Sequence, residues 1–131
     1  MKPAPPFTSE QTVFGHGIYL VAVALGLFLA PGLVRVLLPF SPEVDWWNRI
    51  LALPVLNLGI LCIGVAWIRS RLLMKLTAAT RLLVMASIGI LVALHAAPPI
   101  ALGVGIIDLV SAALTVWALV AERERGIAPP R

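Results

Sequence analysis

Charged residues are scarce in this chain. Only 12% of its 131 residues are Asp, Glu, Lys or Arg, whereas 60% are hydrophobic. Soluble domains are about one-quarter charged, so this composition excludes an ordinary soluble domain. The net charge of +4 is explained by solvated tails and by basic groups that face lipid headgroups. We therefore expect no nucleic-acid partner.

The chain also lacks the usual catalytic and metal-binding motifs. Cys62 is the single cysteine, which excludes an intramolecular disulfide and a cysteine-based metal site. No two carboxylates are placed for paired acid–base chemistry, and no glycine pattern follows a strand as a nucleotide-binding loop would. We predict no catalytic residue and no metal site, and the sequence favours a non-catalytic protein.

Four long apolar blocks make up most of the chain. They cover residues 13–30, 48–68, 77–97 and 100–121. Each is close to the ~20 residues that span a bilayer. Only helices or a closed barrel satisfy backbone polar groups in lipid, and the blocks lack the alternation of barrel strands. We predict an all-α integral membrane bundle of four transmembrane helices over residues 13–121, between a Pro-rich tail (1–12) and a basic tail (122–131).

The connections on one side of the predicted bundle differ in length. Pro31 and Gly32 should end the first helix, and residues 33–38 could form a short interfacial helix before the second. Trp46 and Trp47 stand where aromatic anchors lie at a membrane interface. Residues 96–99 form only a tight turn, so the last two helices should be an antiparallel hairpin.

The basic residues predict the orientation in the membrane. If the chain spans the membrane four times, eight basic residues fall on one side: Lys2, Arg69, Arg71, Lys75, Arg81, Arg123, Arg125 and Arg131. Only Arg35 and Arg49 fall on the other side, a bias of eight to two. Lys and Arg accumulate in cytoplasmic loops. We therefore predict a bacterial inner-membrane protein with both termini in the cytoplasm.

Asp108 is an acidic residue in the middle of the last block, on a stripe of small residues. Helices in membranes touch where small residues recur. The small positions are Ala22, Gly26 and Ala30 in the first block, Ala52, Gly59 and Ala66 in the second, Ala86, Gly89, Ala93 and Ala96 in the third, and Ala101, Gly105 and Ala112 in the fourth. Facing lipid would cost a carboxylate about 3 kcal/mol or more. We therefore expect Asp108 to face the other helices.

Depth along the helices suggests partners for Asp108. At about 1.5 Å per residue, Asn57 and Tyr19 fall at a similar depth to Asp108, about 13–16 Å from the outer edge. Arg49 could act as a counter-ion from above, whereas Arg81 is expected to extend to the inner surface. The predicted polar cluster is Asp108, Asn57, Tyr19 and Arg49. It is either a hydrogen-bonded fastener that sets helix register or a protonation or ligand site.

The two histidines fall near opposite membrane surfaces. His16 is near the cytoplasmic start of the first block, and His95 is near the outer end of the third, roughly 20 Å apart in depth. They cannot share a metal or haem, although each could be an axial ligand to a separate one. We predict no cofactor and leave a pigment, haem or quinone open.

The layout resembles the small four-helix DoxX-like bacterial inner-membrane proteins over residues 13–121. Trp46 and Arg49 at the start of the second block, Gly59, and the segment VGIIDLVSAALT with Asp108 carry the resemblance. The resemblance implies a link to membrane redox chemistry and to soluble redox partners. It implies no enzymatic activity for this chain, because the chain contains no known catalytic motif. The chain also looks like the small multidrug resistance transporters, which have their carboxylate in the first helix rather than the fourth.

Three functions follow from these patterns. The first is a non-catalytic accessory or structural subunit of a larger bacterial membrane complex, with protein partners or self-association in the bilayer. The second is a small oligomeric transporter, or a quinone- or lipid-ligand-binding protein, centred on Asp108. The third is a DoxX-like membrane redox component.

Overall fold

The computed structural model describes residues 6–37 and 45–125, and all of its elements are helical. In chain order they are α1 (Ser9–Leu29), α2 (Pro31–Leu37), α3 (Asp45–Ile68), α4 (Arg71–Ala93), the 3₁₀ turn η1 (Pro99–Ala101) and α5 (Leu102–Glu124). Helices α1, α3, α4 and α5 are each long and apolar enough to cross a membrane. The predicted all-α fold of four transmembrane helices is confirmed.

Helices α1 and α4 begin earlier than the apolar blocks suggested, because polar caps start them. Thr8 and Gln11 form a capping box, so α1 starts at Ser9 rather than at residue 13. The Ser70 side chain accepts a hydrogen bond from the Leu73 amide, so α4 starts at Arg71 rather than at residue 77. His16 and Arg81 therefore lie further along their helices than the apolar blocks suggested.

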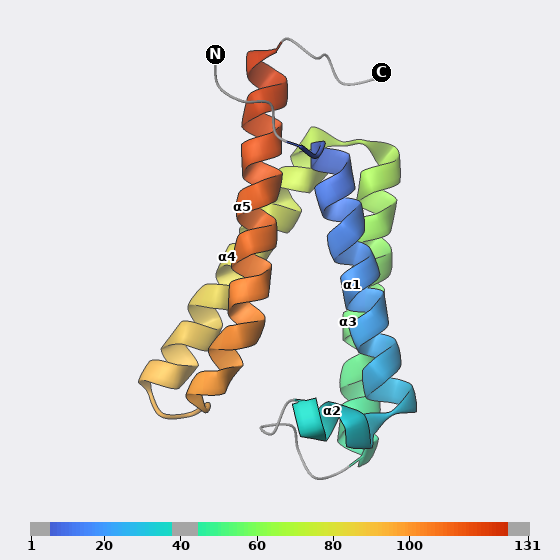
Figure 1. Cartoon of the computed structure of the whole chain (residues 1–131), viewed down its shortest axis with the longest axis vertical. Helices are drawn as coiled ribbons and strands as arrows, with labels where there is room; N and C mark the ends of the chain where they lie inside the picture. Colours follow the sequence, from blue (N-terminus) through green and yellow to red (C-terminus); the bar gives the residue numbers. More distant parts are fainter. Residues whose placement is uncertain (1–5, 38–44, 126–131) are drawn as a thin grey trace.

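The short helix expected after the first span is present as α2, directly after the α1 cap at Ala30. It lies at the end of the molecule opposite the start of α1 and the end of α5 (Figure 1). Residues 1–5 and 126–131 of the predicted tails lie outside the described residues, as do the side chains of Arg35, Trp46 and Trp47. The two tryptophans as interface anchors therefore stay a prediction.

The four long helices form two pairs, α1 with α3 and α4 with α5 (Figure 1). The pairs approach each other at the end that holds the start of α1 and the end of α5, and they separate toward α2 and the α4–α5 turn. Side chains of Val13, Leu20, Cys62, Met74 and Leu119 form an apolar core where α1, α3, α4 and α5 meet. Contact between the pairs is thus concentrated in one half of the molecule.

Glycines set the spacing within each pair. A Cβ added at Gly17 would lie 2.9 Å from the carbonyl oxygen of Gly59, and one at Gly59 would lie 3.0 Å from that of Gly17. The backbones of α1 and α3 therefore touch at this crossing, as small residues allow. In the other pair, Gly105 of α5 faces Met85 of α4, whose sulfur would lie 2.6 Å from an added Cβ.

The small-residue stripes are confirmed in two helices. Ala52, Gly59 and Ala66 are buried in α3, Ala101 is buried at the end of η1, and Gly105 and Ala112 are buried in α5. The expected stripes are wrong at Ala22 of α1 and at Ala86, Ala93 and Ala96 in and just after α4, which are all exposed. For the positions of α4 the physical reason is the separation of the pairs, because α4 has only α5 beside it over its second half.

Candidate functional site

A polar interface joins the two helix pairs near the middle of the bundle. Helix α1 contributes Thr12 and His16, α4 contributes Arg81, and α5 contributes Asp108, Ser111 and Thr115. These six side chains, linked by the contacts given below, are called the polar network. Their spacing of three or four residues on α1 and α5 puts each set on one helix face, so the two faces meet along a line.

Arg81 is the centre of the polar network and is only 4% exposed. Its Nη1 donates to Ser111 Oγ at 2.8 Å and to Thr115 Oγ1 at 3.3 Å, and its Nη2 lies 4.0 Å from Cys62 Sγ of α3. Arginine stays charged in proteins, so this is a permanent positive charge inside the bundle. The expectation that Arg81 extends to the inner surface is wrong, because α4 begins at Arg71 and places residue 81 about 15 Å along the helix.

Asp108 meets His16 rather than the partners predicted for it. Its Oδ1 lies 3.5 Å from His16 Nε2, and the two side chains are 13% and 3% exposed. The other ring nitrogen, Nδ1, is 3.0 Å from Ser111 Oγ. Asp108 therefore faces the other helices, as the small-residue stripe of α5 indicated.

Polar contacts link these groups in a chain. Ser111 Oγ accepts from Arg81 and also meets His16 Nδ1, where the tautomer of the ring decides which group donates. The other ring nitrogen, Nε2, faces the carboxylate of Asp108. A permanent cation and an acidic group are thus connected through a hydroxyl and a titratable ring, which is an arrangement that can hold or pass a proton.

Polar contacts continue from the network toward the ends of the chain. Thr115 Oγ1 lies 3.1 Å from Thr12 Oγ1, whose own hydroxyl donates to the Ser9 carbonyl at 2.8 Å. One turn further, both the amide and the hydroxyl of Ser9 donate to the Glu122 carboxylate, at 2.7 and 2.8 Å. The α1–α5 interface is therefore polar from mid-helix to its end.

Only Tyr19 of the three predicted partners lies near Asp108. Its ring centroid is 5.8 Å from that of His16. Asn57 and Arg49 are both exposed on α3, and no contact joins either of them to Asp108 among the residues described. Matching depth could not give the direction of Asn57 around the helix axis, and its side chain is exposed.

The two predicted axial ligands have different surroundings. His16 is buried in the polar network, with both ring nitrogens in contact with protein groups. His95 is exposed in the turn after α4 and has a left-handed backbone, with φ of 57°. Over residues 6–37 and 45–125, no group of three or more His, Cys, Asp or Glu side chains is placed to hold a metal ion.

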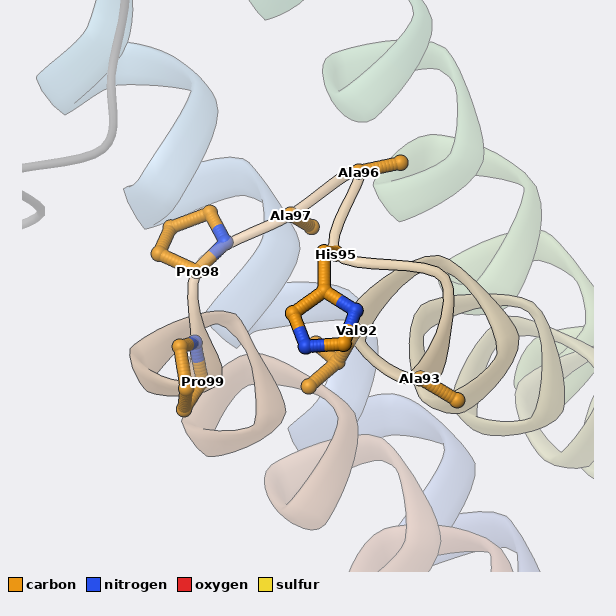
Figure 2. A pocket seen from close by; sticks show the side chains of 7 residues that line it. All are labelled: Val92, Ala93, His95, Ala96, Ala97, Pro98 and Pro99. Carbon is orange, nitrogen blue, oxygen red and sulfur yellow. The ribbon is translucent and has the colours of Figure 1, made fainter.

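Figure 2 shows the surroundings of His95, a hollow of about 600 Å³ at the turn between α4 and α5. The turn is closed by hydrogen bonds from the amides of His95 and Ala96 to the carbonyls of Val92 and Leu91, which is a Schellman arrangement. The remaining lining is alanine and proline. His95 is thus a helix-capping residue and the one titratable group around this hollow.

Sequence reasoning missed Arg81 and His16 as partners of Asp108. A signal was present, because a basic and a titratable residue lie within long apolar runs of α4 and α1, and such residues usually face a bundle interior. Comparison with protein-family models found no match for this chain, and the comparisons with curated proteins and with solved structures found none either.

Proposed function

We propose that this multi-pass membrane protein binds a small organic anion between its two helix pairs, and that binding is linked to the uptake of a proton by His16 and Asp108. The observation that carries the proposal is Arg81. It is a buried cation whose Nε–H has no hydrogen-bond partner in the described part of the chain. An unpaired donor of this kind costs about 1–3 kcal/mol or more, and an anion or a water molecule would satisfy it.

The charges explain why a proton and an anion would bind together. With Asp108 ionised and His16 neutral, the charges of Arg81 and Asp108 cancel. A proton on either Asp108 or His16 leaves one net positive charge, and a buried charge requires a partner. An anion that binds then restores neutrality, so each ligand strengthens the binding of the other.

The same contacts weigh against a purely structural role. A fastener is most effective when every buried group is paired, whereas the polar network leaves one donor of Arg81 unpaired. Burying opposite charges is also a weak source of stability compared with apolar packing. A site that uses these charges accounts for both features.

Thermal unfolding of the purified protein tests the proposal, with monocarboxylates from acetate to octanoate added at about pH 5 and about pH 8. We expect an acid of this series to raise the Tm of the wild-type protein more at the lower pH, where the network gains a proton. Asp108→Asn removes the negative charge permanently. In this variant we expect the anion to raise the Tm at the higher pH as well.

Two arginine variants separate binding from general charge effects. Arg81→Gln removes the buried cation and should abolish the rise in Tm at both pH values. Arg49→Gln removes an exposed cation of α3 and should leave it unchanged. The proposal fails if the acids act equally at both pH values in the wild type, or if Arg81→Gln responds like the wild type.

An accessory subunit is the second candidate, and the exposed amide of Asn57 favours it. Asn57 lies within the apolar span of α3 but does not face the bundle. An amide inside a membrane gains from hydrogen bonding to a neighbouring helix. Gentle extraction from native membranes should then yield a larger complex that Asn57→Leu dissociates. Recovery of the same species from wild type and variant would contradict this role.

The location and the redox role also remain proposals. We place the protein in a bacterial inner membrane with both termini in the cytoplasm, because the basic residues favour that orientation. The resemblance to DoxX-like proteins suggests a membrane redox component. An optical spectrum of the purified protein tests its cofactor-bearing form, since a haem, flavin or pigment would absorb visible light.

A further inference from the structure

A groove lies beside the polar network, between α1 and α5. Its volume is about 400 Å³, within the range of pockets that hold small ligands. One wall is polar and consists of Thr12, His16 and Ser111. Because Ser111 accepts a hydrogen bond from Arg81, the buried cation stands directly behind this wall.

Gln11 and Tyr19 also line the groove, and its apolar lining is Phe7, Gly15, Ile107 and Leu114. Ile107, in α5, is 45% exposed, and Phe7, just before the cap of α1, is 52% exposed. Residues exposed on a membrane-spanning helix, such as Ile107, face acyl chains. A ligand could therefore enter sideways from the bilayer and keep its apolar part in contact with lipid.

We propose that this groove binds a single-chain lipophilic carboxylic acid, such as a fatty acid, with the carboxylate against His16 and Ser111 and the chain passing Ile107 into the bilayer. This inference rests on the proposed function, because it names the anion and its position. Charge complementarity selects the head group, since a proton on Asp108 or His16 leaves the charge of Arg81, behind this wall, without a counter-charge. The apolar walls select the chain.

The depth of the polar wall favours a free acid over a phospholipid. His16 is seven residues after Ser9, the first residue of α1, and so lies about 10 Å along the helix axis. The phosphate of a phospholipid is held in the headgroup layer, outside the hydrocarbon core. A free carboxylic acid can cross that distance in its neutral form and deliver the proton that the polar network takes up.

Gly15 makes a selective test possible. It lines the groove, and a Cβ added there would meet no atom within 4 Å, so a larger side chain would occupy the groove without disturbing the helix packing. Gly103, in α5, has equally open surroundings and is not among the groove residues. Gly15→Leu and Gly103→Leu are therefore a matched pair.

The experiment is photo-crosslinking of the full-length protein in phosphatidylcholine nanodiscs. The probe is a palmitic acid analogue with a diazirine in its chain, and labelled residues are located by mass spectrometry. We expect labelling in residues 7–19 of the N-terminal region and 107–114 of α5. Gly15→Leu should reduce it about tenfold, the equivalent of ~1.4 kcal/mol in binding, while Gly103→Leu should leave it unchanged.

Two further arms identify the head group. The methyl ester of the same probe lacks a charge and should label the groove about tenfold less than the acid. The acid probe should label the groove equally in nanodiscs with and without phosphatidylglycerol. Equal labelling by acid and ester, loss of labelling with phosphatidylglycerol, or an unaffected Gly15→Leu variant would overturn the inference.

The outcomes also separate this inference from the proposed function. If short acids raise the Tm in a proton-linked way but the probe does not label the groove, the inference fails and the proposed function stands. If the probe labels the groove equally at both pH values and in Arg81→Gln, the groove binds lipophilic molecules without the charge. That result contradicts both the choice of a carboxylate and the proposed function.

Discussion

At the scale of single residues, the unusual feature is a pair of opposite charges that do not touch. Arg81 reaches Ser111, Ser111 reaches His16, and His16 reaches Asp108. Direct contact would fix the charges, whereas a hydroxyl and an imidazole between them allow a proton to change position. Each group in such a chain depends on its neighbours for its hydrogen bonds and its charge balance. The effects of substitutions on the free energy of unfolding should therefore not be additive.

A double-mutant cycle tests this dependence. Arg81→Gln and Asp108→Asn should each destabilise the protein, because each leaves the opposite charge buried without compensation. The double variant should be less destabilised than the sum of the two, with a coupling of about 1 kcal/mol or more, measured by reversible unfolding in mixed micelles. The cycle of Arg49→Gln with Asp108→Asn is the control and should be additive, since Arg49 is exposed on α3.

At the scale of helices, each pair is held by the close approach of small residues. The Gly17–Gly59 crossing brings backbone against backbone, while Gly105 meets the flexible end of Met85. A backbone atom cannot move aside without displacing its helix, whereas a methionine side chain can change rotamer. The two crossings should therefore respond differently to an added methyl group.

Three alanine substitutions compare these glycines. Gly59→Ala should destabilise the protein by about 1–3 kcal/mol, because the added Cβ would lie 3.0 Å from the carbonyl oxygen of Gly17. Gly105→Ala should cost less, since Met85 can move. Gly64→Ala, also in α3, meets no atom within 4 Å and serves as the control. Equal unfolding midpoints for the Gly59 and Gly64 variants would show that α1 and α3 are not in backbone contact.

At the scale of the whole molecule, two helix pairs meet at an interface that contains an apolar core and the polar network. Hydrogen bonds and the His16–Asp108 contact connect α1 with α5 from Ser9 to Asp108, whereas within the pairs glycines bring helices into close contact. The polar network lies between α1 of one pair and α4 and α5 of the other. Movement between the pairs would consequently open or close the polar network, and a ligand between them would change that movement.

The orientation of the molecule can be measured with cysteine labelling. The start of α1 and the end of α5 lie at the same end of the molecule (Figure 1), and we propose that this end faces the cytoplasm. Ala96→Cys places an exposed thiol in the α4–α5 turn, and Arg125→Cys places one after α5. A membrane-impermeant maleimide added to whole cells should label only the first, and the native Cys62 should not react because it is buried. Labelling of the Arg125→Cys variant from outside would reverse the assignment.

Burial of Arg81 also refines the charge count behind this orientation. It is held inside the bundle and does not belong to a cytoplasmic loop. Eight basic residues become seven on that side, against Arg35 and Arg49 on the other. The bias keeps its sign, so the expected orientation does not change.

Composition and local pattern were enough to predict four membrane helices, the short helix after the first, and an Asp108 that faces protein. These properties depend on the length of apolar runs and on the cost of a carboxylate in lipid, and both can be read from a linear sequence. The partners of Asp108 were mostly wrong. The apolar blocks began four and six residues later than α1 and α4 do, which placed His16 and Arg81 near the membrane surface instead of inside it.

The sequence by itself therefore determined which segments lie in lipid and which lie in water. It also determined that Asp108 faces the other helices. Only the tertiary structure decided that the helices pair as α1 with α3 and α4 with α5, and that His16, Arg81 and Asp108 meet between the pairs. The physical reason is that hydrophobic length fixes a helix in depth but leaves its rotation and its neighbours free. Those are set by where glycines allow close approach and where buried polar groups find partners.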